Sequence, residues 1–143
     1  EISECLVGSE MCIRDRDAEK QVEEFEIKVA GVDQEIGQLS GGNQQKVLMG
    51  RWMINAPSIL IVDEPTRGID VNAKAEIHRL LCEMNKNGTA VILVSSEMPE
   101  VLGMSDRIVI MHEGRKAGEI GREDATQELL MQIAFGEDEG RKH

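Results

Sequence analysis

Two short apolar runs, separated by a helical pattern, constrain the fold of this chain more than any other feature. The runs are Ile59 to Val62 and Ala90 to Val94, and both consist mainly of β-branched residues. Each run is continuously apolar instead of alternating, which is typical of a strand buried on both faces of a parallel sheet. The sequence therefore predicts two such strands, the second of them extending over Thr89 to Ser95.

The segment between the two runs predicts a helix from about Val71 to Asn87, with Gly88 as its stop. One face of this helix carries apolar side chains at helical spacing: Ile77, Leu80, Leu81 and Met84. Strand, helix and strand in succession favour an α/β layer with an antiparallel edge. The expected fold class is therefore α/β, with a mostly parallel sheet, flanking helices and a C-terminal hairpin.

Further elements are predicted on both sides of this unit. They are an amphipathic helix over Asp17 to Val32, a helix from Asn43 to about Met53 that ends before Pro57, a short helix opened by Pro99, a hairpin of Arg107 to Met111 with Lys116 to Ile120 that turns at Gly114, and a last helix from about Ala125 to Phe135.

Length and charge exclude several classes of protein. The 143 residues suffice for one ordinary domain and not for two. A net charge of −11 opposes non-specific attraction to nucleic acid and to anionic membranes. The aromatic content of 2% also leaves few platforms on which bases could stack. We therefore expect no nucleic-acid partner.

The cysteines and the apolar runs indicate a reduced, cytosolic chain. Cys5, Cys12 and Cys82 have neither CxxC nor Cys/His spacing, and an odd number leaves one unpaired. No apolar run approaches the roughly 20 residues that a membrane-spanning helix requires.

The ends of the chain are set apart from the predicted fold. Residues 1–16 show no clear helical or strand period and lack the features of a signal peptide. We expect a non-native leader there; the alternative is a short native strand and turn. The main body is predicted over 17–136, followed by an acidic and polar tail over 137–143.

Two adjacent carboxylates close the first apolar run. Asp63 and Glu64 precede Pro65, so they are expected at the carboxyl edge of the sheet, where open α/β sheets bind ligands. In nucleotide hydrolysis the first acid of such a pair can hold Mg²⁺, often through water. The second can orient or deprotonate the attacking water. Two solvated acids at a strand end are the alternative.

A second motif, Leu39 to Lys46 with the sequence LSGGNQQK, opens the preceding helix. Ser40 can serve as a helix N-cap or bind a phosphate oxygen, while Gly41 and Gly42 permit close backbone approach to an anion. By itself SGG is also compatible with a flexible loop. Its combination with the acidic pair and with GID at Gly68 to Asp70 favours a phosphate site.

These motifs, with VILVSSEMPEVLGMSDRIVIMHEGR at Val91 to Arg115, closely resemble the ATP-binding subunits of ABC transporters. The resemblance covers Asp17 to Gly136. Within this family, the motifs look most like the second nucleotide-binding half of the two-half ATPases that serve ribose-type monosaccharide importers in bacteria. It implies a partial P-loop NTPase domain that takes part in ATP hydrolysis.

The resemblance assigns roles residue by residue. Leu39 to Gln44 matches the signature motif, so Ser40, Gly41, Gly42, Asn43 and Gln44 are expected to contact the γ-phosphate of an ATP held by the partner half. Asp63 ends the Walker B strand and is the expected Mg²⁺ residue, through water. Glu64 matches the catalytic glutamate, and Asp70 lies in the D-loop, which normally makes a contact across the dimer.

The resemblance also implies cofactors, partners and a location. The cofactors are ATP and Mg²⁺. The expected partners are the other nucleotide-binding half, membrane permease subunits and, indirectly, a periplasmic sugar-binding protein. The expected location is peripheral, on the cytoplasmic face of the bacterial inner membrane.

Two departures qualify these expectations. The sequence contains no GxxxxGK[ST] phosphate loop, which predicts that the chain alone is inactive. Ser96 stands where many ABC ATPases carry a histidine that contacts the γ-phosphate. Two alternatives remain open at this point: an ABC-type ATPase that acts on DNA or ribosomes, and a truncated remnant without enzymatic activity.

Overall fold

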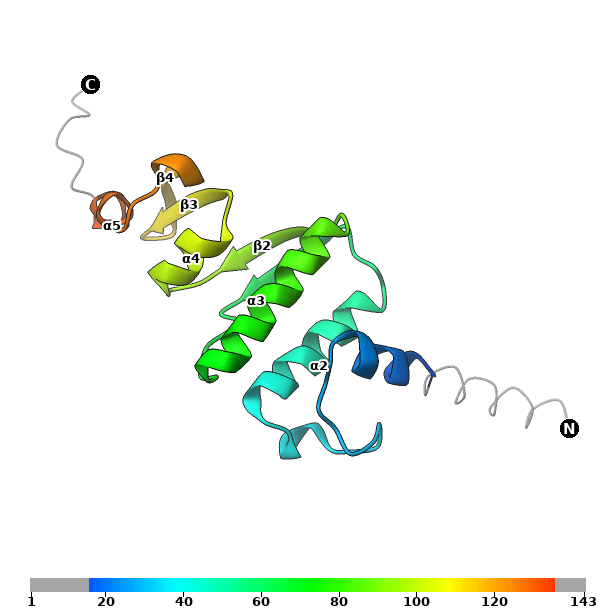
Figure 1. Ribbon diagram of the computed structural model, residues 1–143. Coiled ribbons are helices and arrows are strands. Elements are labelled where there is room, and N and C mark those ends of the chain that lie inside the picture. Colours follow the sequence, from blue (N-terminus) through cyan, green and yellow to red (C-terminus); the bar gives the residue numbers. More distant parts are fainter. Residues whose placement is uncertain (1–15, 136–143) are drawn as a thin grey trace, which may run out of the picture. The chain divides into compact units, whose positions relative to one another are not determined.

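The computed structural model describes residues 16–135, so most of the predicted leader and all of the predicted tail lie outside the described residues. The chain divides into two units between Ile92 and Leu93, and each unit is described by itself. Figure 1 identifies the helices and strands.

The first unit begins with a helix that is shorter than the sequence predicts. Its described part covers 16–24, whereas the apolar spacing predicted a helix as far as Val32. Glu26 adopts a left-handed conformation with φ of 49°. The N–H groups of Glu26 and Ile27 donate to the carbonyls of Glu23 and Val22, the pair of bonds that ends a helix in a Schellman motif. The prediction was wrong in extent because the left-handed position holds a glutamate instead of a glycine.

The next helix, α2 (Gly41–Met53), follows a short 3₁₀ turn, η1 (Ile36–Gln38). Its buried residues share one face: Gly42, Lys46, Met49 and Gly50. Leu48 and Trp52, whose spacing predicted the helix, are instead exposed by 48% and 56%. The helix itself is confirmed. Among the described residues, however, its buried face is not the face that carries Leu48 and Trp52.

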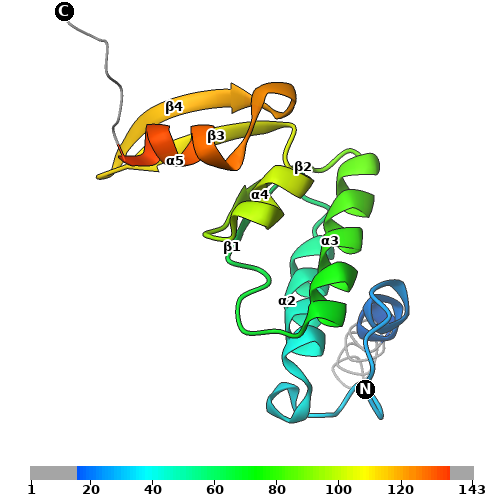
Figure 2. The same cartoon turned by 60° about the vertical axis from the view of Figure 1, so that its left-hand side comes forward.

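The predicted strand–helix–strand unit is present as β1 (Ile59–Asp63), α3 (Val71–Lys86) and β2 (Ala90–Val94). The strands β1 and β2 pair in a two-stranded sheet. The predicted apolar face of α3 is buried throughout. Gly88 ends the helix as expected, with φ of 97°. Helices α2 and α3 lie side by side (Figures 1 and 2).

The strands are not buried on both faces, which corrects the sequence expectation. Ile59 and Ile61 of β1 are exposed by 59% and 67%, and Ile92 of β2 by 50%. Leu60, which points to the other face of β1, is buried. Among the described residues, one face of β1 therefore has no cover, although its composition is that of a strand buried on both faces.

The second unit contains α4 (Met98–Met104), β3 (Arg107–His112), β4 (Arg115–Gly121), the 3₁₀ turn η2 (Arg122–Asp124) and α5 (Gln127–Phe135). The strands β3 and β4 form the predicted antiparallel hairpin. Glu113 and Gly114 both have positive φ, as a two-residue type I′ turn requires. The hairpin forms its own two-stranded sheet, whereas the sequence predicted an antiparallel edge on the α/β layer.

The core of the second unit lies between the hairpin and α5, which run alongside each other in Figure 2. It is built on Ile108, Ile110 and Leu130. A Cβ atom on Gly118 would lie 2.8 Å from the Cγ2 of Ile133, so a glycine is needed where α5 approaches β4.

Candidate functional site

The signature segment forms the N-terminal end of α2. Ser40 occupies the N-cap position with extended backbone angles, φ −60° and ψ 153°. Its carbonyl accepts a hydrogen bond from the N–H of Gln44 at 2.9 Å. Its hydroxyl does not cap a backbone N–H of the first turn and instead accepts from the amide nitrogen of Asn43 at 3.0 Å. The positive end of the helix dipole is therefore not neutralised by this side chain.

The two amide side chains of the motif are engaged locally. The Oδ1 of Asn43 accepts from the N–H of Lys28 at 3.0 Å, which links α2 to the segment after the first helix. The Nε2 of Gln44 donates to the carbonyl of Leu39 at 2.9 Å. Both residues, predicted to bind nucleotide, thus also fix the conformation of the segment that precedes α2.

The two glycines of the motif pack against the start of α3. A Cβ atom on Gly41 would lie 3.2 Å from the Cγ2 of Ile69, within the GID segment. A Cβ atom on Gly42 would lie only 2.6 Å from the Cβ of Ala73, a distance that real side chains do not tolerate. The sequence predicted these glycines for close approach to an anion. The structure adds a second reason for them, which is close contact between two helices.

Asp63 and Glu64 lie at the C-terminal end of β1, as predicted. Asp63 is exposed and is the last residue of the strand. Glu64 is half-buried and has a left-handed backbone with φ of 48°. Its carbonyl accepts from the N–H of Arg67 at 3.2 Å, which closes a turn. Such a conformation is costly for a residue with a side chain, and it directs the chain sharply away from the strand.

Asp70 has a structural role that the sequence reasoning missed. It is the N-cap of α3, and its Oδ1 accepts from the N–H groups of Asn72 and Ala73, each at 3.0 Å. An aspartate directly before a helical pattern is the usual signal for such a cap. A contact of Asp70 across a dimer therefore has to be compatible with this cap.

Ser96 belongs to the second unit, in the segment between β2 and α4, and it is exposed. The remaining candidate residues all belong to the first unit. Within that unit, the structure brings the signature glycines together with the GID segment and the first turn of α3.

A buried lysine links α2 to α3 and was not identified from the sequence. The side chain of Lys46 is 2% exposed, and its Nζ lies 2.5 Å from the Oε2 of Glu76, whose side chain is 40% exposed. The same Nζ donates to the carbonyl of Glu26 at 3.2 Å. Hydrogen bonding and attraction from Lys46 hold the pKa of Glu76 below its ordinary value of 4.5.

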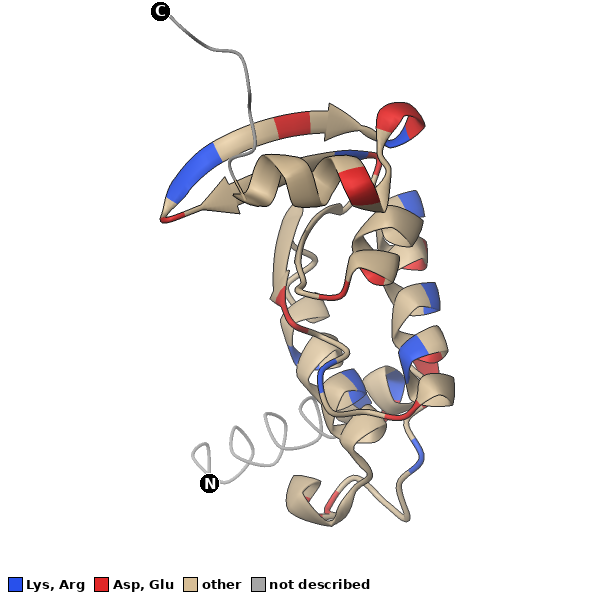
Figure 3. Ribbon diagram, turned by 90° about the vertical axis from the view of Figure 1, so that its left-hand side faces the viewer, with Lys and Arg blue, Asp and Glu red and all other residues tan. Residues whose placement is uncertain are grey.

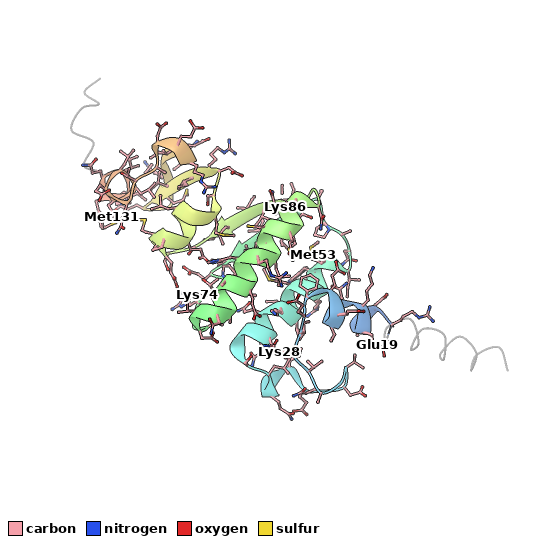
Figure 4. All side chains as sticks on the ribbon, viewed as in Figure 1. Glu19, Lys28, Met53, Lys74, Lys86 and Met131 are labelled. Carbon is pink, nitrogen blue, oxygen red and sulfur yellow. The ribbon has the colours of Figure 1, made fainter. Side chains whose placement is uncertain are left out.

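This lysine could have been found from helical spacing. It lies four residues after Gly42 and three before Met49, on the buried face of α2. Figure 3 shows both signs of charge along α3, the helix that supplies its partner. In Figure 4, Lys74 and Lys86 mark the two ends of α3, and Met53 marks the end of α2.

The donor set suits a metal ion that is shared with a nucleotide. Over 16–135 no group of three or more histidine, cysteine or carboxylate side chains could hold an ion by itself. Mg²⁺ is commonly bound by one or two carboxylates together with substrate phosphates and water. A single exposed carboxylate at Asp63 fits that arrangement.

No helix among the described residues has the length and hydropathy to span a membrane.

An apolar groove of about 510 Å³ lies between α2 and β1. It reaches from Trp52 and Leu48 on the helix to Ile61 and Asp63 on the strand. Side chains of α2 and β1 thus line one apolar groove, which continues past Asp63 to Pro65.

Comparison with known proteins gives consistent matches. The family model described as ABC transporter matches residues 5–67. A protein from Geobacillus kaustophilus, named for ribose/galactose/methyl galactoside import and ATP binding, is 59% identical over 121 residues. Proteins with the same naming from Agrobacterium fabrum and Burkholderia cenocepacia are 60% and 58% identical over 116 and 119 residues. These matches cover 81–85% of this chain but only 23–24% of the relatives.

Solved structures agree with this assignment. A dimeric post-hydrolysis state of the ATP-binding cassette MJ0796, bound to ADP and Pi, is 27% identical with a TM-score of 0.66. The match covers 75% of this chain and 46% of that cassette. A nucleotide-free cassette from an ABC transporter shares the fold with a TM-score of 0.70, at 22% identity over 85% of this chain and 46% of its own. The predicted fold class is thereby confirmed, and the chain belongs to the ATP-binding domain family of the ABC transporters.

Proposed function

We propose that the full-length protein hydrolyses ATP to energise the import of a ribose-like monosaccharide across the bacterial inner membrane. The names and the 58–60% identity of the relatives support this function. The chain spans about a quarter of their length, so the activity is assigned to the full-length protein.

The observation that carries the proposal is the construction of the α2 N-terminus. Its N-cap hydroxyl leaves the first-turn N–H groups uncapped, and its glycines lie directly against the segment before α3. Helix N-termini with glycine backbone are suited to binding phosphate. We assign Ser40, Gly41 and Gly42, with Asn43 and Gln44, to the γ-phosphate of an ATP held by the partner half.

The end of β1 would serve a different ATP. Asp63 would hold Mg²⁺, mainly through water, and the ion would neutralise charge on the phosphates. Glu64 would orient or deprotonate the water that attacks the γ-phosphate. Its half-buried position after the strand is compatible with this role. Asp70 would contact the partner half while it caps α3.

The two ATP sites of such a dimer would differ in strength. Ser96 can donate a hydrogen bond to the γ-phosphate, but it cannot carry the positive charge of an imidazolium ion toward the transition state. The site built on Asp63 and Glu64 would therefore be weaker or mainly structural. The signature of this chain would complete the stronger site, whose other parts lie on the partner half.

The proposed partners follow from the proposed function. The other nucleotide-binding half would supply the second face of each ATP site. Permease subunits would bind the protein at the cytoplasmic face of the inner membrane. A periplasmic sugar-binding protein would act on it indirectly, through the permease.

Reconstitution tests this function directly. The full-length protein is combined with its permease subunits in proteoliposomes, and ATP hydrolysis and uptake of labelled ribose are measured with and without the sugar-loaded binding protein. We expect both rates to rise with the loaded binding protein. Glu128→Gln, on an exposed position of α5, serves as a control and should leave both rates unchanged. Stimulation by DNA or ribosomes, without uptake, would contradict the proposal.

A further inference from the structure

Lys46 joins three segments of the first unit at one buried point. Its ammonium group on α2 contacts the carboxylate of Glu76 on α3 and donates to the carbonyl of Glu26, just after the first helix. Burial of an ammonium group is costly unless it is paired and hydrogen-bonded. An apolar side chain would satisfy the same buried position at lower cost, so the charge calls for an explanation beyond packing.

The contacts of Lys46 and Gly42 form two consecutive steps along the α2–α3 interface. Gly42 meets Ala73, and Lys46, one turn later on α2, meets Glu76, one turn later on α3. One contact between two helices leaves them free to slide or rotate about it. Two contacts, one of them a directional ion pair, fix both the register and the rotation of α2 on α3.

From this geometry we infer that Lys46 and Glu76 are positioning residues for the signature segment. They hold the N-terminus of α2 in a fixed register against α3, and thereby against the GID segment that precedes it. The inference rests on the proposed function, because positioning matters for activity only if this helix end meets a phosphate.

The strongest test removes the tether without leaving an unpaired buried charge. Lys46→Met places an unbranched apolar side chain in the buried position, and the remaining carboxylate is 40% exposed and can be hydrated. In the reconstituted full-length transporter we expect the KM for ATP to rise about fivefold to tenfold, while turnover at saturation changes little. A purely structural role predicts turnover lowered in proportion to the folded fraction, with an unchanged KM.

Glu76→Gln is the second variant. It should also raise the KM for ATP, and it should lower the thermal unfolding temperature more than Lys46→Met does. The reason is that it leaves the ammonium group of Lys46, which is 2% exposed, without its carboxylate partner. The opposite order of stabilities would overturn the account of the pair.

Arg79→Gln is the matched control on the same helix. Arg79 pairs with Glu26 at 2.8 Å and with Glu83 at 3.1 Å, but its side chain is 46% exposed and neither partner lies on α2. This variant removes ion pairs of α3 without touching the α2–α3 register. Its KM for ATP should equal that of the wild type.

Amide hydrogen exchange separates a failure of this inference from a failure of the proposed function. In full-length protein without nucleotide, Lys46→Met should accelerate exchange about tenfold at residues 44–48, the first hydrogen-bonded amides of α2, with exchange over the middle of α3 unchanged. Unchanged exchange at residues 44–48 overturns the positioning role, whatever the activity. A wild-type transporter without ATPase activity overturns the proposed function, and the exchange result still decides the inference.

Discussion

The N-terminal end of α2 and the C-terminal end of β1 are both proposed to belong to ATP sites, but they are built differently. The α2 end is fixed by contacts with neighbouring segments, through Gly42 on Ala73 and through Lys46 on Glu76. The β1 end carries an exposed Asp63 at the edge of a strand whose alternate residues are also exposed. The end that would serve a partner's ATP is thus preorganised by the described residues, whereas the end that would serve the chain's own ATP stands open.

The exposed face of β1 shows what this openness means physically. Ile59 and Ile61 are more than half exposed, and with Trp52 they border the apolar groove between α2 and β1. Apolar area of this kind contributes to stability only when it is removed from water. A preorganised end and an open end therefore predict different responses to substitution.

Substitutions at the α2 end and at the β1 end test the difference between them most directly. Ser40→Arg places a long cationic side chain at the N-cap of α2, where the proposed γ-phosphate would meet the helix. We expect turnover of the reconstituted transporter to fall about 100-fold, the usual order for loss of a preorganised phosphate or oxyanion contact. Glu64→Gln should reduce turnover less, because the site that it serves is the weaker one.

Ser58→Arg is the control for this pair of variants, since it makes the same change at an exposed serine before β1. It should leave turnover near that of the wild type. Equal losses from Ser40→Arg and Glu64→Gln, or a larger loss from Glu64→Gln, would refute the difference between the two ends.

Packing at the α2 end predicts the second effect. Gly42→Ala introduces a Cβ atom 2.6 Å from that of Ala73, so we expect the full-length protein to lose about 1–3 kcal/mol of unfolding free energy. The double variant Gly42→Ala/Ala73→Gly should recover most of this loss, because it removes the overlapping atom. Denaturant unfolding of the full-length protein measures both.

Gly103→Ala in α4 is the matched control, because no atom lies within 4 Å of the position of its Cβ. There the exchange should be neutral or stabilise the protein by up to about 1 kcal/mol. If Gly42→Ala behaves in the same way, the close contact does not restrain α2.

Much of the fold could be predicted from local sequence signals. Gly88 ends α3 and Gly114 turns the hairpin because both positions require positive φ, which glycine adopts freely. The sequence prediction made the first helix too long because the left-handed residue at its end is Glu26, and a glutamate does not signal a helix end. Apolar composition identified β1 as a strand, but composition does not reveal what covers its faces.

The candidate site was predictable in sequence position but not in its supports. The motifs placed Ser40 at a helix start and Asp63 at a strand end, and the structure confirms both positions. Lys46 was missed because a charged side chain is ordinarily assigned to solvent. The contacts of Gly42 and Lys46 with α3 are tertiary, so they depend on which face of α2 is buried, and the apolar residues of α2 suggested a different face.

Substitutions of Asp70, at the start of α3, should have a smaller effect. Asp70→Ala removes the acceptor for the N–H groups of Asn72 and Ala73, so it should cost about 1 kcal/mol of unfolding free energy. Asp70→Asn retains a capping oxygen and should preserve stability. A loss of transporter turnover in Asp70→Asn at full stability would reveal the proposed contact across the dimer. Unchanged turnover would limit Asp70 to its capping role.

The smallest predicted effect is the pH dependence of the ion pair that fixes α2. Since Lys46 lowers the pKa of Glu76 in the folded protein, the pair contributes stability above the ordinary value of 4.5 and loses it as the pH falls through the folded value. The difference in unfolding temperature between wild type and Glu76→Gln should therefore be constant near neutral pH. It should shrink as the pH falls below 4.5. The effect is modest because the carboxylate is 40% exposed and solvent screens the pair. In a Lys46→Met background the same comparison should show a weaker pH dependence, since the group that lowers the pKa of Glu76 most is gone and only attraction from Lys28 and Arg79 remains. A difference that persists unchanged in acid, or that is undiminished in Lys46→Met, would mean that this pair does not restrain the α2 end.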